Sequence, residues 1–196
     1  MLKVALTGGI ATGKSHVLQR IRAHGVPCLD ADELTHGVTA AGTEATGAIA
    51  ARFGSDVLDT TGAVDRQKLG KIVFADASAR RDLEAIVHPA VYRAIAAGLR
   101  AFELLESSPL AVVDIPLLFE TGHARDFDRV IATTCSRDAQ LSRLRKRGLS
   151  EAEANQRLAA QMSADDKASR ADDVIRTDGT IDETNAQVDR LLKSLT

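Results

Sequence analysis

Cysteine is scarce in this chain, with two residues among 196, Cys28 and Cys135. Both stand in apolar stretches far apart in the sequence, without the close spacing of a metal-binding or redox pair. We therefore expect two small core residues in a protein of the reducing cytoplasm. The chain also lacks a leader that joins a basic segment to an apolar one, so we expect no signal peptide.

Two further absences concern possible partners. No apolar run approaches the ~20 residues that a membrane-spanning helix needs, so we expect no membrane partner. Neither sign of charge dominates, because 25 Lys and Arg stand against 27 Asp and Glu. A surface of this kind does not attract nucleic acid nonspecifically, and we expect no nucleic-acid partner. The 44% hydrophobic and 27% charged residues are typical of a globular protein.

What the chain does contain is a glycine-rich stretch near its first residue, GGIATGKS at residues 8–15. An apolar run precedes it and a segment of helical period follows, which is the strand–loop–helix context of a phosphate-binding loop. In such a loop, backbone N–H groups surround the phosphates, Lys14 reaches the β- and γ-phosphates, and the Ser15 hydroxyl binds Mg²⁺. The predicted ATP contacts of this loop are Gly9, Ala11, Thr12, Gly13, Lys14, Ser15 and His16.

Strand-like and helical segments alternate along the chain, which predicts an α/β fold with a parallel sheet covered by helices. Five strands are expected, at residues 4–6, 26–29, 110–115, 130–133 and 174–176. The first helix is expected over residues 13–24, and the last over residues 181–195 behind a capping box of Thr180 and Glu183. With its phosphate-binding loop, this pattern predicts a P-loop NTPase fold of the nucleoside-monophosphate-kinase type.

Two long stretches interrupt this single domain of residues 1–196. Residues 35–107 carry apolar side chains at helical spacing, which predicts an inserted helical lobe beside the sheet. Residues 136–171 are rich in arginine and predict a lid, with a capping box at Ser150 and Glu153. Within the lid, Arg143 and Arg147 are four positions apart and suit clamping of ATP phosphates from one helix face. The alternative is a solvated helix face, which we expect for Arg145 and Lys146.

Carboxylates end two of the predicted strands. Asp30 and Asp32 close the second strand, where one carboxylate can act as general base and one can cap the following helix. Asp114 closes the third strand, an apolar run with the shape of a Walker B segment, and is a candidate ligand of Mg²⁺. His88 lies in the helical lobe, and its spacing alone favours a structural histidine.

Together these motifs resemble the dephospho-CoA kinase family over nearly the whole chain. The resemblance rests on TGGI at residues 7–10, GKS at 13–15, DAD at 30–32, DR at 65–66, LEAIVHP at 83–89, PLLFE at 116–120 and ADDVI at 171–175. The phosphate loop is shared by P-loop proteins in general, whereas TGGI, DAD and PLLFE together are specific. Two alternatives stay open: another small-molecule P-loop kinase with a nucleoside or sugar acceptor, and a non-catalytic ATP-binding regulatory module.

The resemblance implies phosphorylation of the ribose 3′-hydroxyl of dephospho-CoA by ATP and Mg²⁺, giving coenzyme A and ADP. It implies Asp32 as general base beside Lys14, with ATP contacts from Arg143 and Arg147. The implied substrate contacts are Thr7, Asp32, Arg66 and His88, and the implied metal ligands are Ser15 and Asp114. The chain departs from the family where Ala11-Thr12 replaces the usual Gly-Ser, His16 the usual Thr, and Arg176-Thr177 the usual Asn.

Overall fold

The computed structural model describes residues 1–105 and 108–195. They form two compact units, one of Met1–Leu29 with Ala101–Thr196 and one of Asp30–Arg100. No helix among these residues is long and apolar enough to cross a membrane.

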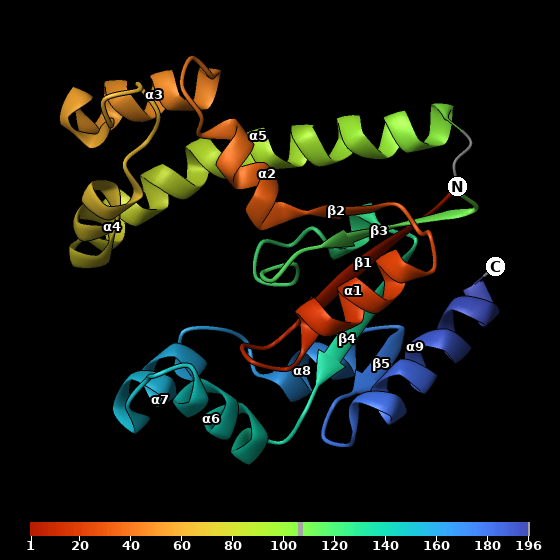
Figure 1. Ribbon diagram of the computed structural model, residues 1–196. Helices are drawn as coiled ribbons and strands as arrows, with labels where there is room; N and C mark the ends of the chain where they lie inside the picture. Colours follow the sequence, from red (N-terminus) through yellow and green to blue (C-terminus); the bar gives the residue numbers. More distant parts are fainter. Residues whose placement is uncertain (106–107, 196) are drawn as a thin grey trace. The chain divides into compact units, whose positions relative to one another are not determined.

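A five-stranded sheet forms the centre of the first unit, with the strand order β2-β3-β1-β4-β5 (Figure 1). The strands are β1 (Leu2–Gly8), β2 (Cys28–Asp30), β3 (Leu110–Asp114), β4 (Arg129–Thr134) and β5 (Asp173–Arg176). β1 pairs in parallel with both β3 and β4, and β4 pairs in parallel with β5. The predicted five-stranded parallel sheet of a P-loop kinase is confirmed, although β2 begins two residues later than expected.

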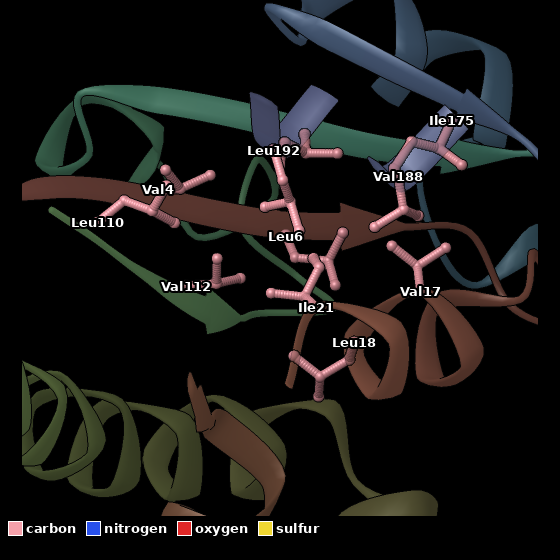
Figure 2. Close-up of a cluster of buried hydrophobic side chains, with 11 residues drawn as sticks. Val4, Leu6, Val17, Leu18, Ile21, Leu110, Val112, Ile175, Val188 and Leu192 are labelled. Atoms are coloured by element: carbon pink, nitrogen blue, oxygen red, sulfur yellow. The ribbon is translucent and has the colours of Figure 1, made fainter. Parts of the chain in front are cut away.

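Apolar side chains from the strands and two helices build the core of this unit. Helix α1 (Lys14–Ala23) and helix α9 (Ile181–Leu195) pack on the sheet, and their apolar residues point toward the strands (Figure 2). The buried members are Val4, Leu6, Val17, Leu18, Ile21, Leu110, Val112, Ile131, Ile175, Val188 and Leu192. Val4 and Leu6 point to this side, so the alternation of a strand turns Ala5 and Thr7 to the other face. The core thus fixes both ends of the loop that joins β1 to α1.

Three helices lie between β4 and β5: α6 (Arg137–Lys146), α7 (Glu151–Ala159) and α8 (Ala164–Arg170). Each begins at a serine whose hydroxyl accepts a hydrogen bond from a backbone N–H of the first turn. The capping box predicted at Ser150 and Glu153 is confirmed, as is the one at Thr180 and Glu183. α8 packs against β1 and β4.

The second unit is built from helices. They are α2 (Ala31–Val38), α3 (Glu44–Phe53), the 3₁₀ turn η1 (Ser55–Val57), α4 (Arg66–Ala75) and α5 (Ala77–Leu104), whose last turn belongs to the first unit. Ile49, Val57, Val64 and Leu69 form its buried cluster.

Both cysteines are packed in the first unit. Cys28 is half-buried in β2, and Cys135 is buried directly after β4. Burial raises the pKa of both thiols, that of Cys28 to about 11. A raised pKa keeps both groups as thiols, and only the thiolate is reactive. Both side chains therefore behave as core residues.

Gly8 ends β1 at a point where the backbone leaves no room for a side chain. A Cβ atom at this position would collide with Thr133 Oγ1 and lie 2.9 Å from the Thr133 carbonyl oxygen. We expect Gly8→Ala to lower the free energy of unfolding by about 1–3 kcal/mol, seen as a lower melting temperature. Gly47→Ala in α3 is the control, because nothing lies within 4 Å of its added Cβ. It should melt at the parent temperature or above, since Ala favours a helix. A Gly8→Ala variant that melts like the parent would refute the close packing.

Candidate active site

The loop between β1 and α1 has the geometry of an anion-binding site. Ala11 and Gly13 both adopt the left-handed conformation, with φ values of 61° and 85°. No side chain caps the start of α1. Among the described residues, no acceptor is recorded for the N–H groups of Ala11 and Gly13, and the first N–H groups of a helix lack intrahelical partners. These donors are available to bind phosphate oxygens.

The carbonyl groups of the same loop are held by side chains from later segments. Gln140 Nε2 donates to the Ile10 carbonyl oxygen at 2.7 Å, and Arg143 Nη1 donates to the Ala11 carbonyl oxygen at 3.0 Å. Thr177 Oγ1 donates to the Thr12 carbonyl oxygen at 2.8 Å. A carbonyl oxygen that pointed at a bound phosphate would repel it. Because these three hydrogen bonds hold the carbonyl groups, they favour a loop whose N–H groups point toward the phosphate. Sequence reasoning did not give these three residues this role.

Lys14 and Asp114, one hundred residues apart, meet at the start of α1. Lys14 Nζ lies 2.5 Å from both carboxylate oxygens of Asp114. Asp114 ends β3 next to Leu6 of β1 and is only 3% exposed, so its carboxylate is fixed beside the phosphate loop. The structure thus brings together the predicted phosphate-binding lysine and the predicted metal ligand.

The residues at this place suit a magnesium ion bound together with a nucleotide. The Asp114 carboxylate already holds a cation, the Lys14 ammonium, and the Ser15 hydroxyl is exposed at the first turn of α1. A carboxylate and a hydroxyl are oxygen ligands that Mg²⁺ accepts, with phosphates and waters completing its shell.

The predicted lid arginines have different surroundings. Arg143 is half-buried and donates to Thr177 Oγ1 at 3.0 Å and to the Thr177 carbonyl oxygen at 2.5 Å, in addition to Ala11. Arg147 is exposed and lies at the C-cap, because α6 ends at Lys146. Arg145 is exposed and pairs with Glu151, as expected for a solvated face.

Three side chains predicted at the site have partners inside the first unit. Thr7 is fully buried and its hydroxyl donates to the Pro116 carbonyl oxygen at 3.2 Å. Thr12 Oγ1 donates to the Gly9 carbonyl oxygen at 2.8 Å. The His16 ring bonds to Asn185 Oδ1 of α9 at 2.9 Å. The backbone N–H groups of Thr12 and His16 are also engaged, with the Gly9 carbonyl oxygen at 3.3 Å and the Gly13 carbonyl oxygen at 3.0 Å, so the ATP contacts expected of these two residues stay predictions.

In the second unit, the structure separates the two aspartates at the end of β2. Asp30 is the N-cap of α2, and its carboxylate accepts from the N–H groups of Asp32 at 2.8 Å and Glu33 at 3.3 Å. Asp32 lies in the first turn of α2 and is exposed. One of the pair caps the helix, as predicted, and it is Asp30.

Arg66 and His88 line one apolar groove of the second unit, of about 330 Å³. Leu69, Val73, Phe74 and Val87 form part of its apolar wall. Arg66, the first residue of α4, donates to His36 Nε2 at 2.7 Å. The groove therefore combines a cationic group with an apolar surface, on which Phe74 is 91% exposed.

Comparison with known proteins gives a consistent answer. The family model described as dephospho-CoA kinase matches residues 2–183. A dephospho-CoA kinase of Anaeromyxobacter dehalogenans is 47% identical over 199 residues, covering 100% of this chain and 92% of the relative.

Two solved structures are similar over almost the whole chain. A Thermus thermophilus protein has a TM-score of 0.83 and 31% identity, covering 100% of this chain and 98% of its own. The dephospho-CoA kinase from Campylobacter jejuni has a TM-score of 0.74 and 26% identity, covering 98% and 96%. Together with the family match, these similarities show that the chain belongs to the dephospho-CoA kinase family.

Proposed function

We propose that this protein transfers the γ-phosphoryl group of ATP to the ribose 3′-hydroxyl of dephospho-CoA, giving coenzyme A and ADP. The observation that carries the proposal is the phosphate loop in a chain of this family, where the Ala11 and Gly13 N–H groups have no acceptor among the described residues and Lys14 is held at Asp114. Another small-molecule kinase and a non-catalytic ATP-binding module are not favoured, because the family match covers residues 2–183.

The first unit supplies the phosphate-binding groups. Backbone N–H groups of the loop, among them those of Ala11 and Gly13, bind the ATP phosphates, and Lys14 moves from Asp114 to a phosphate oxygen when the nucleotide enters. Asp114 and Ser15 would hold Mg²⁺, which neutralises charge on the transferred phosphoryl group. Fixed charges of this kind stabilise the transition state because they need no reorganisation during the reaction.

The second unit supplies the acceptor side. Asp32 takes the proton of the attacking 3′-hydroxyl, a role that its free carboxylate permits because Asp30 makes the helix cap. Arg66 and His88 contact the substrate from the groove, in an inserted substrate lobe of approximately residues 35–107. Residues 136–171 act as the lid, with Arg143 and Arg147 toward ATP.

The lid arginines give a testable contrast. Arg143→Ala removes the hydrogen bonds to Ala11 and Thr177, so we expect kcat/KM for ATP to fall by roughly 10- to 100-fold, since a bond from a charged donor is worth ~1.5–3 kcal/mol. Arg145→Ala is the matched control on the same helix and should stay within twofold of the parent. Steady-state kinetics decide the matter, and equal losses in the two variants would refute a specific role for Arg143.

A coupled ADP-release assay tests the proposed function. The acceptors are dephospho-CoA, adenosine, shikimate and gluconate at equal concentration, with ATP and Mg²⁺ in excess. We expect ADP release above background with dephospho-CoA and with none of the other three acceptors. Preferred use of another acceptor would support a different kinase, and ATP binding without ADP release for any acceptor would support a regulatory module.

A further inference from the structure

A lysine with no assigned role lies buried beside the phosphate loop. Lys167 of α8 is 0% exposed. Its Nζ donates to the Pro116 carbonyl oxygen at 2.5 Å and forms an ion pair with Glu120 Oε1 at 2.9 Å. Burial lowers the pKa of this ammonium, and the bond to Glu120 opposes the effect. Because a buried charge is costly unless it is paired, these two contacts hold Lys167 in a defined place.

Both partners of Lys167 also bind a second group. The Pro116 carbonyl oxygen accepts from Thr7 Oγ1 at 3.2 Å, and Glu120 Oε1 accepts from the Met162 N–H at 3.1 Å. The ammonium therefore joins α8 to the segment of residues 115–120 and, through a shared acceptor, to the end of β1. This is the sheet face opposite α1 and α9, as the alternation along β1 requires.

The segment of residues 115–120 follows Asp114 directly. The Ile115 N–H donates to the Leu6 carbonyl oxygen at 2.9 Å, which continues the sheet. Beyond Ile115 the regular pairing ends, and the Pro116 carbonyl is fixed by Thr7 and Lys167 instead. The backbone that directly follows Asp114 is thus fixed at two consecutive residues, Ile115 and Pro116.

We propose that Lys167 is a positioning residue for phosphoryl transfer, which fixes the segment after β3 and thereby holds the Asp114 carboxylate in place for Lys14 and Mg²⁺. The inference rests on the proposed kinase function. Groups that orient a metal ligand without touching the metal typically change metal affinity or activity by ~10–100-fold when they are removed. Lys167 acts in this indirect way, through its hydrogen bond to the Pro116 carbonyl oxygen.

The test is Lys167→Met, which keeps an unbranched side chain and removes the ammonium. ATP affinity is measured by calorimetry in Mg²⁺ and in EDTA, without acceptor. We expect the ratio of the two dissociation constants to shrink about 10-fold, because the effect acts on the Mg²⁺-dependent part of binding. In turnover assays we expect kcat to fall by ~10–100-fold while the KM for dephospho-CoA stays within twofold.

Two variants separate positioning from mere stability. Lys193→Met on α9 is the matched control, because Lys193 is exposed, and it should behave as the parent. Lys167→Met combined with Glu120→Leu removes the carboxylate left without its partner and should recover the melting temperature but not the Mg²⁺ dependence. Recovery of both properties in this double variant would overturn the proposal.

Glu120→Gln provides a milder change should Lys167→Met not fold. It keeps an acceptor for Lys167 and Met162, and we expect a smaller shift of the Mg²⁺ dependence in the same direction. An unchanged Mg²⁺ dependence in folded Lys167→Met or Glu120→Gln protein would also overturn the proposal. A parent protein that binds Mg²⁺ and ATP without turnover would refute the kinase function, while the binding comparison would still decide the role of Lys167.

Discussion

Lys14→Ala is expected to lower turnover of ATP and dephospho-CoA by ~10²–10³-fold, the usual effect of removing one group that stabilises transition-state charge. Lys14 Nζ lies 2.5 Å from both oxygens of Asp114, at the start of α1. Steady-state kinetics at saturating ATP measure the loss. Near-normal turnover would refute the assignment of residues 8–15 as the phosphate loop.

The same substitution affects stability, and a second variant separates the two effects. Lys14→Ala leaves the nearly buried Asp114 carboxylate without this cation, so the melting temperature without nucleotide should fall. Lys14→Ala combined with Asp114→Asn removes the carboxylate charge and should recover much of that loss. Turnover should remain at the level of Lys14→Ala or below. Recovery of turnover together with stability would indicate that Lys14 is only a structural partner of Asp114.

Asp32→Asn is expected to reduce turnover by about 10²–10⁴-fold, because it removes the proton acceptor and keeps the shape of the side chain. ATP affinity and melting temperature should stay close to the parent values, since Asp32 is exposed and Asp30 makes the helix cap. The measurements are kcat with dephospho-CoA, calorimetric ATP binding and a thermal melt.

Asp30→Asn is the matched control, because asparagine caps a helix about as well as aspartate. It should retain most of the activity and the melting temperature. If Asp30→Asn is inactive while Asp32→Asn behaves as the parent, the general base is Asp30. If both variants turn over normally, neither carboxylate is the base.

The features that the sequence predicted correctly are local ones. A capping box such as Ser150 and Glu153 involves residues three positions apart, so its letters nearly determine its geometry. The phosphate loop is likewise contained in eight consecutive residues between an apolar strand and a helix. The five strands were recognised because a parallel sheet buries near-continuous apolar runs.

The features that the sequence did not predict depend on residues far apart in the chain. Arg143 was predicted to contact ATP, and the sequence did not indicate that it also donates to the Ala11 carbonyl oxygen, 132 positions away. Thr177 donates to the Thr12 carbonyl oxygen and accepts from Arg143. Nothing in the local pattern around either residue indicates these partners.

The contacts of Lys167 could not be predicted from the sequence either. It follows Asp165 and Asp166 in a polar stretch that is typical of a solvated helix. The available signal was its spacing, because Ala164 and Lys167 are three positions apart and share the buried face of α8. Only the tertiary structure shows that Glu120 and Pro116 contact Lys167 on that face.

Phosphoryl transfer to the ribose 3′-hydroxyl is tested most directly by the dependence of ADP formation on that one hydroxyl group of the acceptor. Dephospho-CoA and its 3′-deoxy analogue are compared with the parent protein at saturating ATP and Mg²⁺, with coenzyme A quantified in parallel. We expect one ADP for each coenzyme A formed from dephospho-CoA, and only background ADP release with the analogue. Equal ADP formation with both compounds would contradict phosphoryl transfer to the ribose 3′-hydroxyl.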